Sequence, residues 1–420
     1  MENSQLIKII DFWKKNLEQN IPFGRTLVSK INFNTSEVID LIGVRRSGKS
    51  FILKLIIKNR KIGEESLYLN FEDPFFIENS QPQIIEQFID VYKEHFNKDL
   101  HYLFFDEIQV VRNWESAVRK LREGGNYKIF ITGSSSKLLS GELATLLTGR
   151  HLSYGVFPLS FFEFLEVEKV EFKTEKTRVL GEQLLKKKFS EFLECGGFPE
   201  VVKTKNLALL KNYFYDILEK DILSRHEIRT KTVLEKMALF LLSNTGKLTS
   251  MESLKKTFDL SYETVAVYLD YLKETFLVFE LCQFSYSLKT QQKAFKKIYA
   301  IDHGLSLAVS FHFSPDYGQM LESLVFIELK RRELEIYYYK TKGNLEVDFF
   351  VFEKAKKELI QVCWSMADEK TRHRETRALV AAMEEVGLRE GLILTGDEEG
   401  EVETATGKIM LKPVWKWLLE

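Results

Sequence analysis

The sequence has few cysteines, almost no net charge and no long apolar run. Its three cysteines, Cys195, Cys282 and Cys363, lie far apart along 420 residues. This spacing argues against a disulfide framework or a zinc cluster and favours a reducing compartment. No apolar run reaches the ~18 residues that a membrane-spanning helix needs, and the first residues carry no basic-then-apolar targeting signal. We therefore expect no membrane segment and a cytoplasmic location.

The charges nearly cancel: 60 basic and 61 acidic residues give a net charge of -1. This balance provides no general attraction to nucleic acid, so any contact with DNA must come from local basic patches. The chain is also long for one hydrophobic core, which predicts two or three domains. It lacks an Asn-Lys-x-Asp motif after its first third, and this absence disfavours a GTP-binding protein.

A glycine-bounded loop near residue 45 carries the clearest chemical signal. It follows an apolar strand and completes the pattern G-x-x-x-x-G-K-[ST] of a phosphate-binding loop. Its glycines let successive backbone N–H groups turn toward an anion, and the next helix adds its positive end. We expect Lys49 on the β- and γ-phosphates of ATP and the Ser50 hydroxyl on Mg²⁺. The predicted nucleotide-binding residues of this loop are Gly43, Val44, Arg45, Arg46, Ser47, Gly48, Lys49, Ser50 and Phe51.

Two adjacent carboxylates end a second apolar strand, at residues 101–106. Open α/β sheets bind their ligands at the C-terminal ends of the strands. Asp106 is therefore predicted to hold Mg²⁺, and Glu107 to orient and deprotonate an attacking water. On its own the pair would be read as a solvated turn, but it follows a phosphate loop with one β-α unit between. That order favours the catalytic interpretation.

Two further candidates come later in the first third of the chain. The strand at residues 128–132 ends in hydroxyls, and Thr132 or Ser134 is placed to contact the γ-phosphate or the attacking water. An ordinary turn explains the same residues. Arg150 is the first cation after a predicted helix at 137–147. It is either a finger that reaches a neighbouring subunit's phosphate or a surface charge.

Strands that alternate with helices predict an α/β fold with a parallel sheet covered on both faces. One extra strand separates the phosphate loop from the Asp106–Glu107 strand. It marks the class of phosphate-loop proteins with a catalytic glutamate, in which the sensor strand lies between the other two. The predicted strand order is 5-1-4-3-2. The five predicted strands are 37–43, 66–71, 101–106, 128–132 and 151–157.

Residues 236–300 favour a winged helix. Helical periodicity at 234–242, a cap at Thr249 and a second at Ser261 predict three helices, followed by a hairpin wing. On DNA, the third helix would face the bases and the wing would reach phosphates. Glu263 and Asp270 would repel DNA, and protein docking remains an alternative. The predicted DNA contacts are Tyr262, Glu263, Thr264, Lys289, Lys293, Lys296 and Lys297.

The last hundred residues partly match a nuclease pattern of clustered carboxylates and a lysine. Glu322 on a helix and Asp348 on a strand fit two of its positions. The E-x-K position instead reads Gln361-Val362-Cys363, and neither an amide nor a thiol replaces a carboxylate ligand or the activating lysine. We expect no nuclease activity, with Glu322 and Asp348 held in hydrogen bonds.

The ordered set GVRRSGKS, FFDEIQ, ITGSSS, LLTGR and Gly196-Gly-Phe-Pro-Glu200 resembles the prokaryotic AAA-like P-loop ATPases of the AAA+ superfamily that carry a C-terminal domain of unknown function. The resemblance runs from about residue 20 to the end. It implies an AAA+ core, a helical lid, a winged helix and a domain similar to restriction endonucleases. Related signal-transduction ATPases contact adenine through a Gly-x-Pro turn, which implies that role for Pro199. A second sensor arginine in the lid is not evident.

These observations predict an N-terminal helix and linker (1–35), an ATPase core (36–165), a helical lid (166–235), a winged helix (236–312) and a degenerate restriction-endonuclease-like domain (313–420). The expected activity is Mg²⁺-dependent ATP hydrolysis that acts on duplex or branched DNA, in a homo-oligomer such as a hexamer-like ring. The alternative is an ATP-dependent signalling or scaffold switch that recruits proteins through its C-terminal domains. A small-molecule kinase is a weaker interpretation.

Overall fold

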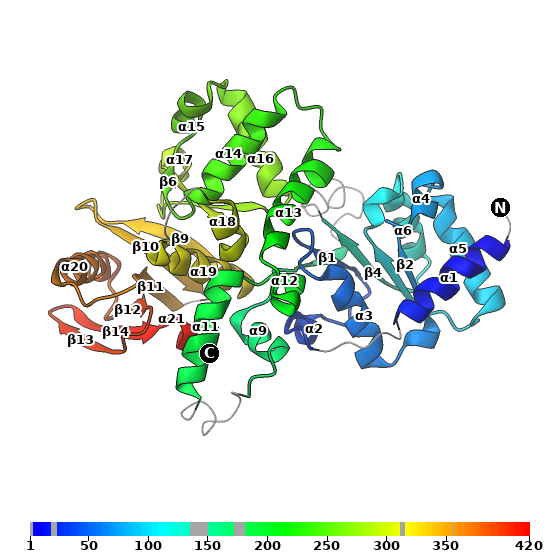
Figure 1. Cartoon of the computed structure of the whole chain (residues 1–420), viewed down its shortest axis with the longest axis horizontal. Helices are drawn as coiled ribbons and strands as arrows, with labels where there is room; N and C mark the ends of the chain where they lie inside the picture. The colour runs from blue at the N-terminus through cyan, green and yellow to red at the C-terminus, as the bar shows by residue number, and fades with distance from the viewer. Residues whose placement is uncertain (1–2, 18–22, 135–149, 172–180, 311–315, 355) are drawn as a thin grey trace. The chain divides into compact units, whose positions relative to one another are not determined.

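The computed structural model describes residues 3–17, 23–134, 150–171, 181–310, 316–354 and 356–420. These residues fall into two compact units, Met1–Phe157 and Pro158–Glu420, which are described separately below. Figure 1 traces the helices and strands of both along the chain. Among the described helices, none combines the length and the apolar character needed to cross a bilayer.

The first unit is built on a five-stranded parallel sheet with the order β2-β3-β4-β1-β5. This is the predicted order 5-1-4-3-2 read from the other edge, so the predicted fold class is confirmed. The central strands are almost entirely buried, and Val, Ile, Leu and Phe fill most of their positions on both faces. The five strands are β1 (Val38–Ile42), β2 (Ser66–Asn70), β3 (Tyr102–Asp106), β4 (Lys128–Gly133) and β5 (His151–Gly155).

Helices cover this sheet, and one of them begins directly at the phosphate-binding loop. That helix is α3 (Lys49–Arg60), and Gly48 caps it with a positive φ of 98°. Its apolar face joins the core that β1, β3 and β4 contribute. The predicted helix at 137–147 lies outside the described residues. The other helices of this unit are α1 (Asn3–Leu17), α2 (Leu27–Lys30), α4 (Pro74–Glu78), α5 (Gln83–His95) and α6 (Trp114–Glu123).

The second unit begins with a group of helices. The first of them, α9 (Phe161–Val167), opens with a reciprocal capping box between Ser160 and Glu163. A later helix, α18 (His303–Val309), packs on α11 and α13. The remaining members of the group are α11 (Glu182–Cys195), α12 (Pro199–Thr204), α13 (Ala208–Asp216) and a π-helical turn at Ile217–Leu223.

Three helices and a small antiparallel sheet of order β6-β8-β7 follow. Ser261 caps α16 as predicted, but the cap of α15 is Ser250 and not Thr249. The predicted wing is not a plain hairpin, because a short helix joins β7 to β8. The elements are α14 (Lys231–Ser243), β6 (Leu248–Thr249), α15 (Met251–Phe258), α16 (Tyr262–Glu274), β7 (Val278–Leu281), α17 (Leu288–Lys293) and β8 (Lys296–Ala300).

The chain ends in a six-stranded mixed sheet with the order β13-β14-β12-β11-β10-β9. A hydrophobic core forms between this sheet and helix α20, around Phe350, Leu379 and Ile393. The elements are α19 (Tyr317–Arg331), β9 (Glu335–Lys340), β10 (Glu346–Glu353), β11 (Lys356–Val362), α20 (Glu369–Val386), β12 (Glu390–Thr395), β13 (Gly400–Thr404), β14 (Gly407–Pro413) and α21 (Val414–Trp417).

Candidate nucleotide site

The phosphate-binding loop joins the end of β1 to the start of α3. Gly43 passes so close to the backbone that a Cβ atom there would lie 2.1 Å from the carbonyl oxygen of Val156. Only glycine fits at this point. Arg46 adopts a left-handed conformation with φ of 69°, and Gly48 turns the chain into the helix. The loop therefore has the tight curvature that anion binding requires.

Lys49 is buried beneath this loop, with 4% of its surface exposed. Its ammonium donates hydrogen bonds to the carbonyl oxygens of Gly43 (3.1 Å) and Val44 (3.3 Å). The same nitrogen lies 3.4 Å from Oε1 of Glu107. A lysine held in this way is a fixed positive charge at the mouth of the loop.

Glu107 follows β3 in a left-handed conformation, with φ of 51°. Strained backbone of this kind persists where the surrounding structure holds it, often at functional sites. Gln109 donates a hydrogen bond of 2.6 Å to Oε2 of Glu107. Burial acts to raise the pKa of Glu107, but Lys49 and Gln109 lower it below its usual range. The side chain is thus kept ionised, as a general base must be.

Asp106 ends β3 and is fully buried. Tyr68 donates a hydrogen bond of 2.7 Å to its Oδ2, and Thr132 donates one of 2.6 Å to its Oδ1. Burial raises the pKa of this carboxyl, and the neighbouring Glu107 adds to the rise. Hydrogen bonds from Ser50, Thr132 and Tyr68 act in the opposite direction. A cation at this carboxylate would hold it ionised.

Thr132 connects the two carboxylates. Its hydroxyl bonds to Asp106 and also accepts the backbone N–H of Glu107 at 2.9 Å. Among the two hydroxyls weighed at the end of β4, Thr132 therefore contacts the acidic pair. Ser134 is buried nearby along the chain, and its contact with a phosphate stays a prediction.

Arg25, Tyr68 and Gln109 were missed by the sequence analysis. Arg25 is buried and donates to the carbonyl oxygens of Ser47 (2.9 Å) and Phe157 (2.8 Å), so it supports the loop from below. Nothing in the linker around Arg25 signals this role. Tyr68 has the appearance of an ordinary apolar strand residue. Gln109 closes the FFDEIQ motif two residues after Glu107, but that motif alone assigned it no role.

The remaining predicted site residues lie around the loop or away from it. Phe51 stacks on Phe23, with ring centroids 4.6 Å apart. Arg45 forms an ion pair of 2.9 Å with Glu72. Pro199 is the first residue of α12 in the second unit, and its contact with adenine stays a prediction.

Arg150 lies at the N-terminal end of the parallel strands, whereas the loop lies at their C-terminal end. Its carbonyl oxygen accepts the N–H of Val38, the first residue of β1, whereas the loop follows the last residue of that strand. Because β1 has five residues, its two ends are about 16 Å apart. Its guanidinium lies 3.7 Å from Glu123. Arg150 is thus remote from the loop of its own chain.

These residues fit a magnesium–nucleotide complex. A curved loop, a buried lysine and the start of a helix supply the positive potential that binds phosphates. Asp106 supplies an oxygen ligand of the kind that Mg²⁺ prefers, and Ser50 contacts it from the loop.

A second cluster of ionisable groups lies in the other unit, around Lys297 on β8. Only 3% of its surface is exposed, so the prediction that Lys297 reaches DNA phosphates is wrong. Its ammonium contacts Glu322 (2.9 Å), Glu346 (2.9 Å) and Asp348 (3.0 Å). Tyr299 also donates a hydrogen bond of 2.6 Å to Glu322. The ammonium thus lies between the two carboxylates that match the nuclease pattern.

Gln361 takes part in the same network by a different route. Its amide oxygen accepts the N–H of Asp348 (3.2 Å), and its amide nitrogen donates to Glu375 (2.5 Å). Glu322 and Asp348 are therefore held in hydrogen bonds, as predicted. In the described part of the chain, no three His, Cys, Asp or Glu side chains are arranged to hold a metal ion.

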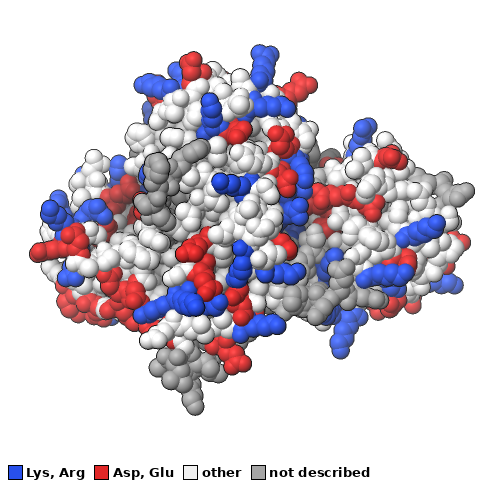
Figure 2. Space-filling view, viewed as in Figure 1, with Lys and Arg blue, Asp and Glu red and all other residues white. Residues whose placement is uncertain are grey.

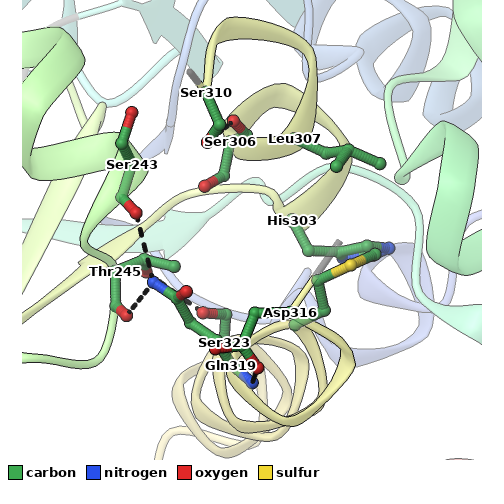
Figure 3. Close-up of a pocket in the computed structure, with 10 residues that line it drawn as sticks. Ser243, Thr245, His303, Ser306, Leu307, Ser310, Asp316, Gln319 and Ser323 are labelled. Carbon is green, nitrogen blue, oxygen red and sulfur yellow. Dashed lines mark hydrogen bonds between the residues drawn. The ribbon is translucent and has the colours of Figure 1, made fainter. Parts of the chain in front are cut away.

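Five of the ten residues that line one hollow in the second unit carry hydroxyl groups. Figure 3 shows Gln319 from α19 pointing to the carbonyl groups of Ser243 and Thr245, with Ser306 of α18 and Ser310, which follows that helix, on the opposite wall. The space is about 30 Å³. This is room for about two water molecules and not for an organic ligand.

Three family models match the chain in succession. An AAA domain matches residues 35–165, and two domains of unknown function, DUF8612 and DUF4143, match residues 186–316 and 317–415. Two solved structures are similar in fold alone. The Orc1 protein of Aeropyrum pernix in complex with DNA covers 73% of this chain and 91% of its own, at 9% identity and a TM-score of 0.26. Cdc6p of Pyrobaculum aerophilum covers 77% and 95%, at 11% identity and a TM-score of 0.24.

Full-length relatives give a closer comparison. An uncharacterized protein of Methanocaldococcus jannaschii is 37% identical over 94% of this chain and 91% of its own length. An uncharacterized protein of Haemophilus influenzae is 33% identical over 80% of this chain and 85% of its own. The chain belongs to their family, the AAA+ P-loop ATPases that carry C-terminal domains of unknown function.

Proposed function

We propose that this protein hydrolyses ATP with the help of Mg²⁺. The observation that carries the proposal is the buried convergence of Lys49, Asp106 and Glu107 at the edge of the sheet where the loop lies. A fixed cation, an oxygen ligand and an ionised base are the three elements of in-line attack by water on a phosphate. An ionised glutamate next to the proposed metal-binding aspartate suits water better than an alcohol as the nucleophile.

Each group has one role in this proposal. Lys49 and the loop N–H groups bind the β- and γ-phosphates. Ser50 and Asp106 would hold Mg²⁺, and the cation would supply charge neutralisation at the phosphates. Glu107 takes the proton of the attacking water. Gln109 and Thr132 orient Glu107 through its carboxylate and its backbone N–H. Ser134 senses the γ-phosphate, and Pro199 contacts adenine.

Release of phosphate by the purified full-length chain tests the proposal. Turnover is expected only with both ATP and Mg²⁺, and Lys49→Ala should remove nucleotide binding because the loop loses the buried cation proposed to contact the phosphates. Lys58→Ala, on the exposed end of α3, is the matched control and should behave as the wild type. Equal turnover in the wild type and Lys49→Ala would contradict the proposal. Stable ATP binding without turnover would favour the signalling switch.

We propose that the enzyme works as a homo-oligomer, in a hexamer-like ring. Support comes from Arg150, which is about 16 Å from its own loop and exposed, so that a phosphate it contacts must belong to a neighbour. An arginine supplied by another subunit stabilises charge in the transition state of phosphoryl transfer. The site would then be complete only between two copies.

We propose further that residues 236–312 form a winged helix that contacts DNA. The order of α14, β6, α15, α16, β7 and β8 and the small sheet β6-β8-β7 support this reading. The segment between β7 and β8 exposes Tyr286 (91%) and Leu288 (74%) beside Lys289 and Lys293. Aromatic side chains with adjacent cations suit nucleic acid. By contrast, Figure 2 shows acidic side chains gathered over the β13–β14 corner.

Charge removal at this segment is expected to weaken DNA binding. Lys289→Ala with Lys293→Ala should lower the slope of log duplex affinity against log salt concentration by the share of about two phosphate contacts. Fluorescence anisotropy at two salt concentrations measures this slope. Lys356→Ala with Lys357→Ala, two exposed lysines on β11, is the control and should change little. An unchanged affinity and salt slope in the first variant would exclude DNA contact through this segment.

The same proposal covers the helical lid, the C-terminal domain and the location of the protein. Residues 166–235 serve as the lid, and residues 313–420 form a restriction-endonuclease-like domain without nuclease activity, because Lys297 neutralises the carboxylates that a metal ion would need. The three cysteines are free, which supports a reducing, cytoplasmic location.

A further inference from the structure

Tyr68 lies in the middle of β2, the edge strand of the parallel sheet. It faces Phe104 across the β2–β3 pair, and from there its side chain reaches two residues further to Asp106. Its hydroxyl donates a hydrogen bond of 2.7 Å to Oδ2 of Asp106, and 3% of the tyrosine is exposed. Because Thr132 bonds the other oxygen, both carboxylate oxygens have a fixed donor.

The N-terminal helix α1 holds the Tyr68 ring from outside the sheet. Trp13 packs against this ring, with centroids 5.8 Å apart and an interplanar angle of 57°. Leu6 and Ile10 anchor the helix, and they are 2% exposed. Contacts of α1 with β2 and α5 keep the helix in place. A chain of direct contacts thus runs from α1 through Trp13 and Tyr68 to Asp106.

We infer that Tyr68 is a positioning residue for the metal-binding carboxylate, and that α1 supports it through Trp13. The inference rests on the proposed Mg²⁺–nucleotide site, because it assigns to Asp106 the role of metal ligand. Each carboxylate oxygen has two lone pairs, so the tyrosine and threonine bonds fix the plane of the group while leaving a lone pair for a cation. The N-terminal helix becomes part of the nucleotide site without touching nucleotide.

Loss of the tyrosine hydroxyl would free one side of the carboxylate. Hydrogen bonds that orient a metal ligand contribute roughly 10- to 100-fold to metal affinity. The affinity for metal therefore falls, whereas turnover at saturating metal changes little, since Glu107 and Lys49 keep their own contacts. A merely structural role would lower stability without this separation.

The experiment measures Mn²⁺ affinity by electron paramagnetic resonance, with ADP present, in the full-length chain. Tyr68→Phe is expected to bind Mn²⁺ at least about tenfold more weakly than the wild type. The Mg²⁺ concentration for half-maximal turnover should rise by the same factor. Tyr92→Phe is the matched control. Tyr92 of α5 is also buried, and its hydroxyl donates a hydrogen bond of 2.9 Å to the carbonyl oxygen of Glu64.

Two further variants test the part played by α1. Trp13→Leu removes the ring contact and should weaken Mn²⁺ binding in the same direction, while Trp13→Phe keeps an aromatic ring and should restore much of it. Equal Mn²⁺ affinity in Tyr68→Phe and Tyr92→Phe would overturn the inference about Tyr68. A Mn²⁺ affinity of Trp13→Leu equal to that of the wild type would overturn the role of α1. Absence of Mn²⁺–ADP binding in the wild type would overturn the nucleotide site itself.

Discussion

Replacing Glu107 with glutamine is expected to lower ATP turnover by at least about a hundredfold while ATP still binds. The substitution keeps the size of the side chain and its bond with Gln109, but it removes the group that accepts a proton from water. Binding persists because the loop, Lys49 and Asp106 are untouched. Steady-state phosphate release and equilibrium binding of a labelled nucleotide measure the two effects separately.

The pKa of Glu107 gives this prediction a second part. Since Lys49 and Gln109 hold that pKa below its usual range against the effect of burial, the base stays ionised throughout the neutral range. Wild-type turnover should therefore not be limited by protonation of this group between pH 6 and 8. Glu86→Gln, a surface carboxylate paired with Lys120, is the control. Wild-type rates in Glu107→Gln would mean that another group activates the water.

Replacing Lys297 with methionine is expected to destabilise the second unit by about 3–5 kcal/mol. The variant keeps the length and apolar stem of the lysine but leaves Glu322 and Asp348 buried without their cation. Scanning calorimetry should show a fall in the melting temperature of roughly 10 °C for a unit of this size. Lys356→Met, on the exposed part of β11, is the control and should shift it little.

The pH dependence of this loss distinguishes charge from packing. Burial raises the pKa of Glu322 to about 7, although Lys297 acts against the rise. The folded state thus binds the proton more tightly than the unfolded state. The stabilisation from this proton is present at low pH and disappears as the pH rises from about 4.5 to 7.

The Lys297→Met variant should consequently lose more stability at pH 8, where Glu322 of the wild type is ionised and paired with Lys297, than at pH 5, where Glu322 holds a proton in the wild type. Adding Glu322→Gln to it should recover part of the loss at pH 8. An equal loss at both values would indicate a packing effect and contradict the electrostatic account.

The phosphate-binding loop and its sheet could be predicted because their requirements are local. Glycines at 43 and 48, the lysine and the apolar strands are dictated by neighbouring residues, so the pattern is visible in a few positions. The helix caps were nearly as clear, and the error at Thr249 was one residue. Strand order followed from the number of strands between the loop and Asp106.

The contacts that tune the site could not be predicted because their partners are distant in sequence. Tyr68 and Asp106 are 38 residues apart, and Arg25 reaches a carbonyl group 132 residues away. Lys297 was assigned to DNA because it lies in the predicted wing, and its carboxylate partners are 25 and 51 residues further on. Local patterns carry no information on such pairs.

The Lys297 cluster also bears on how this chain can be divided. The two C-terminal family matches meet between residues 316 and 317, yet the ammonium belongs to the first segment and its three carboxylates to the second. Separating the chain at that junction would leave Lys297 in one fragment and its carboxylate partners in the other, each without its opposite charge. Exchange of one segment between relatives would have to carry the matching charges along. The two segments are therefore expected to be inherited as a pair, whatever separate tasks they perform.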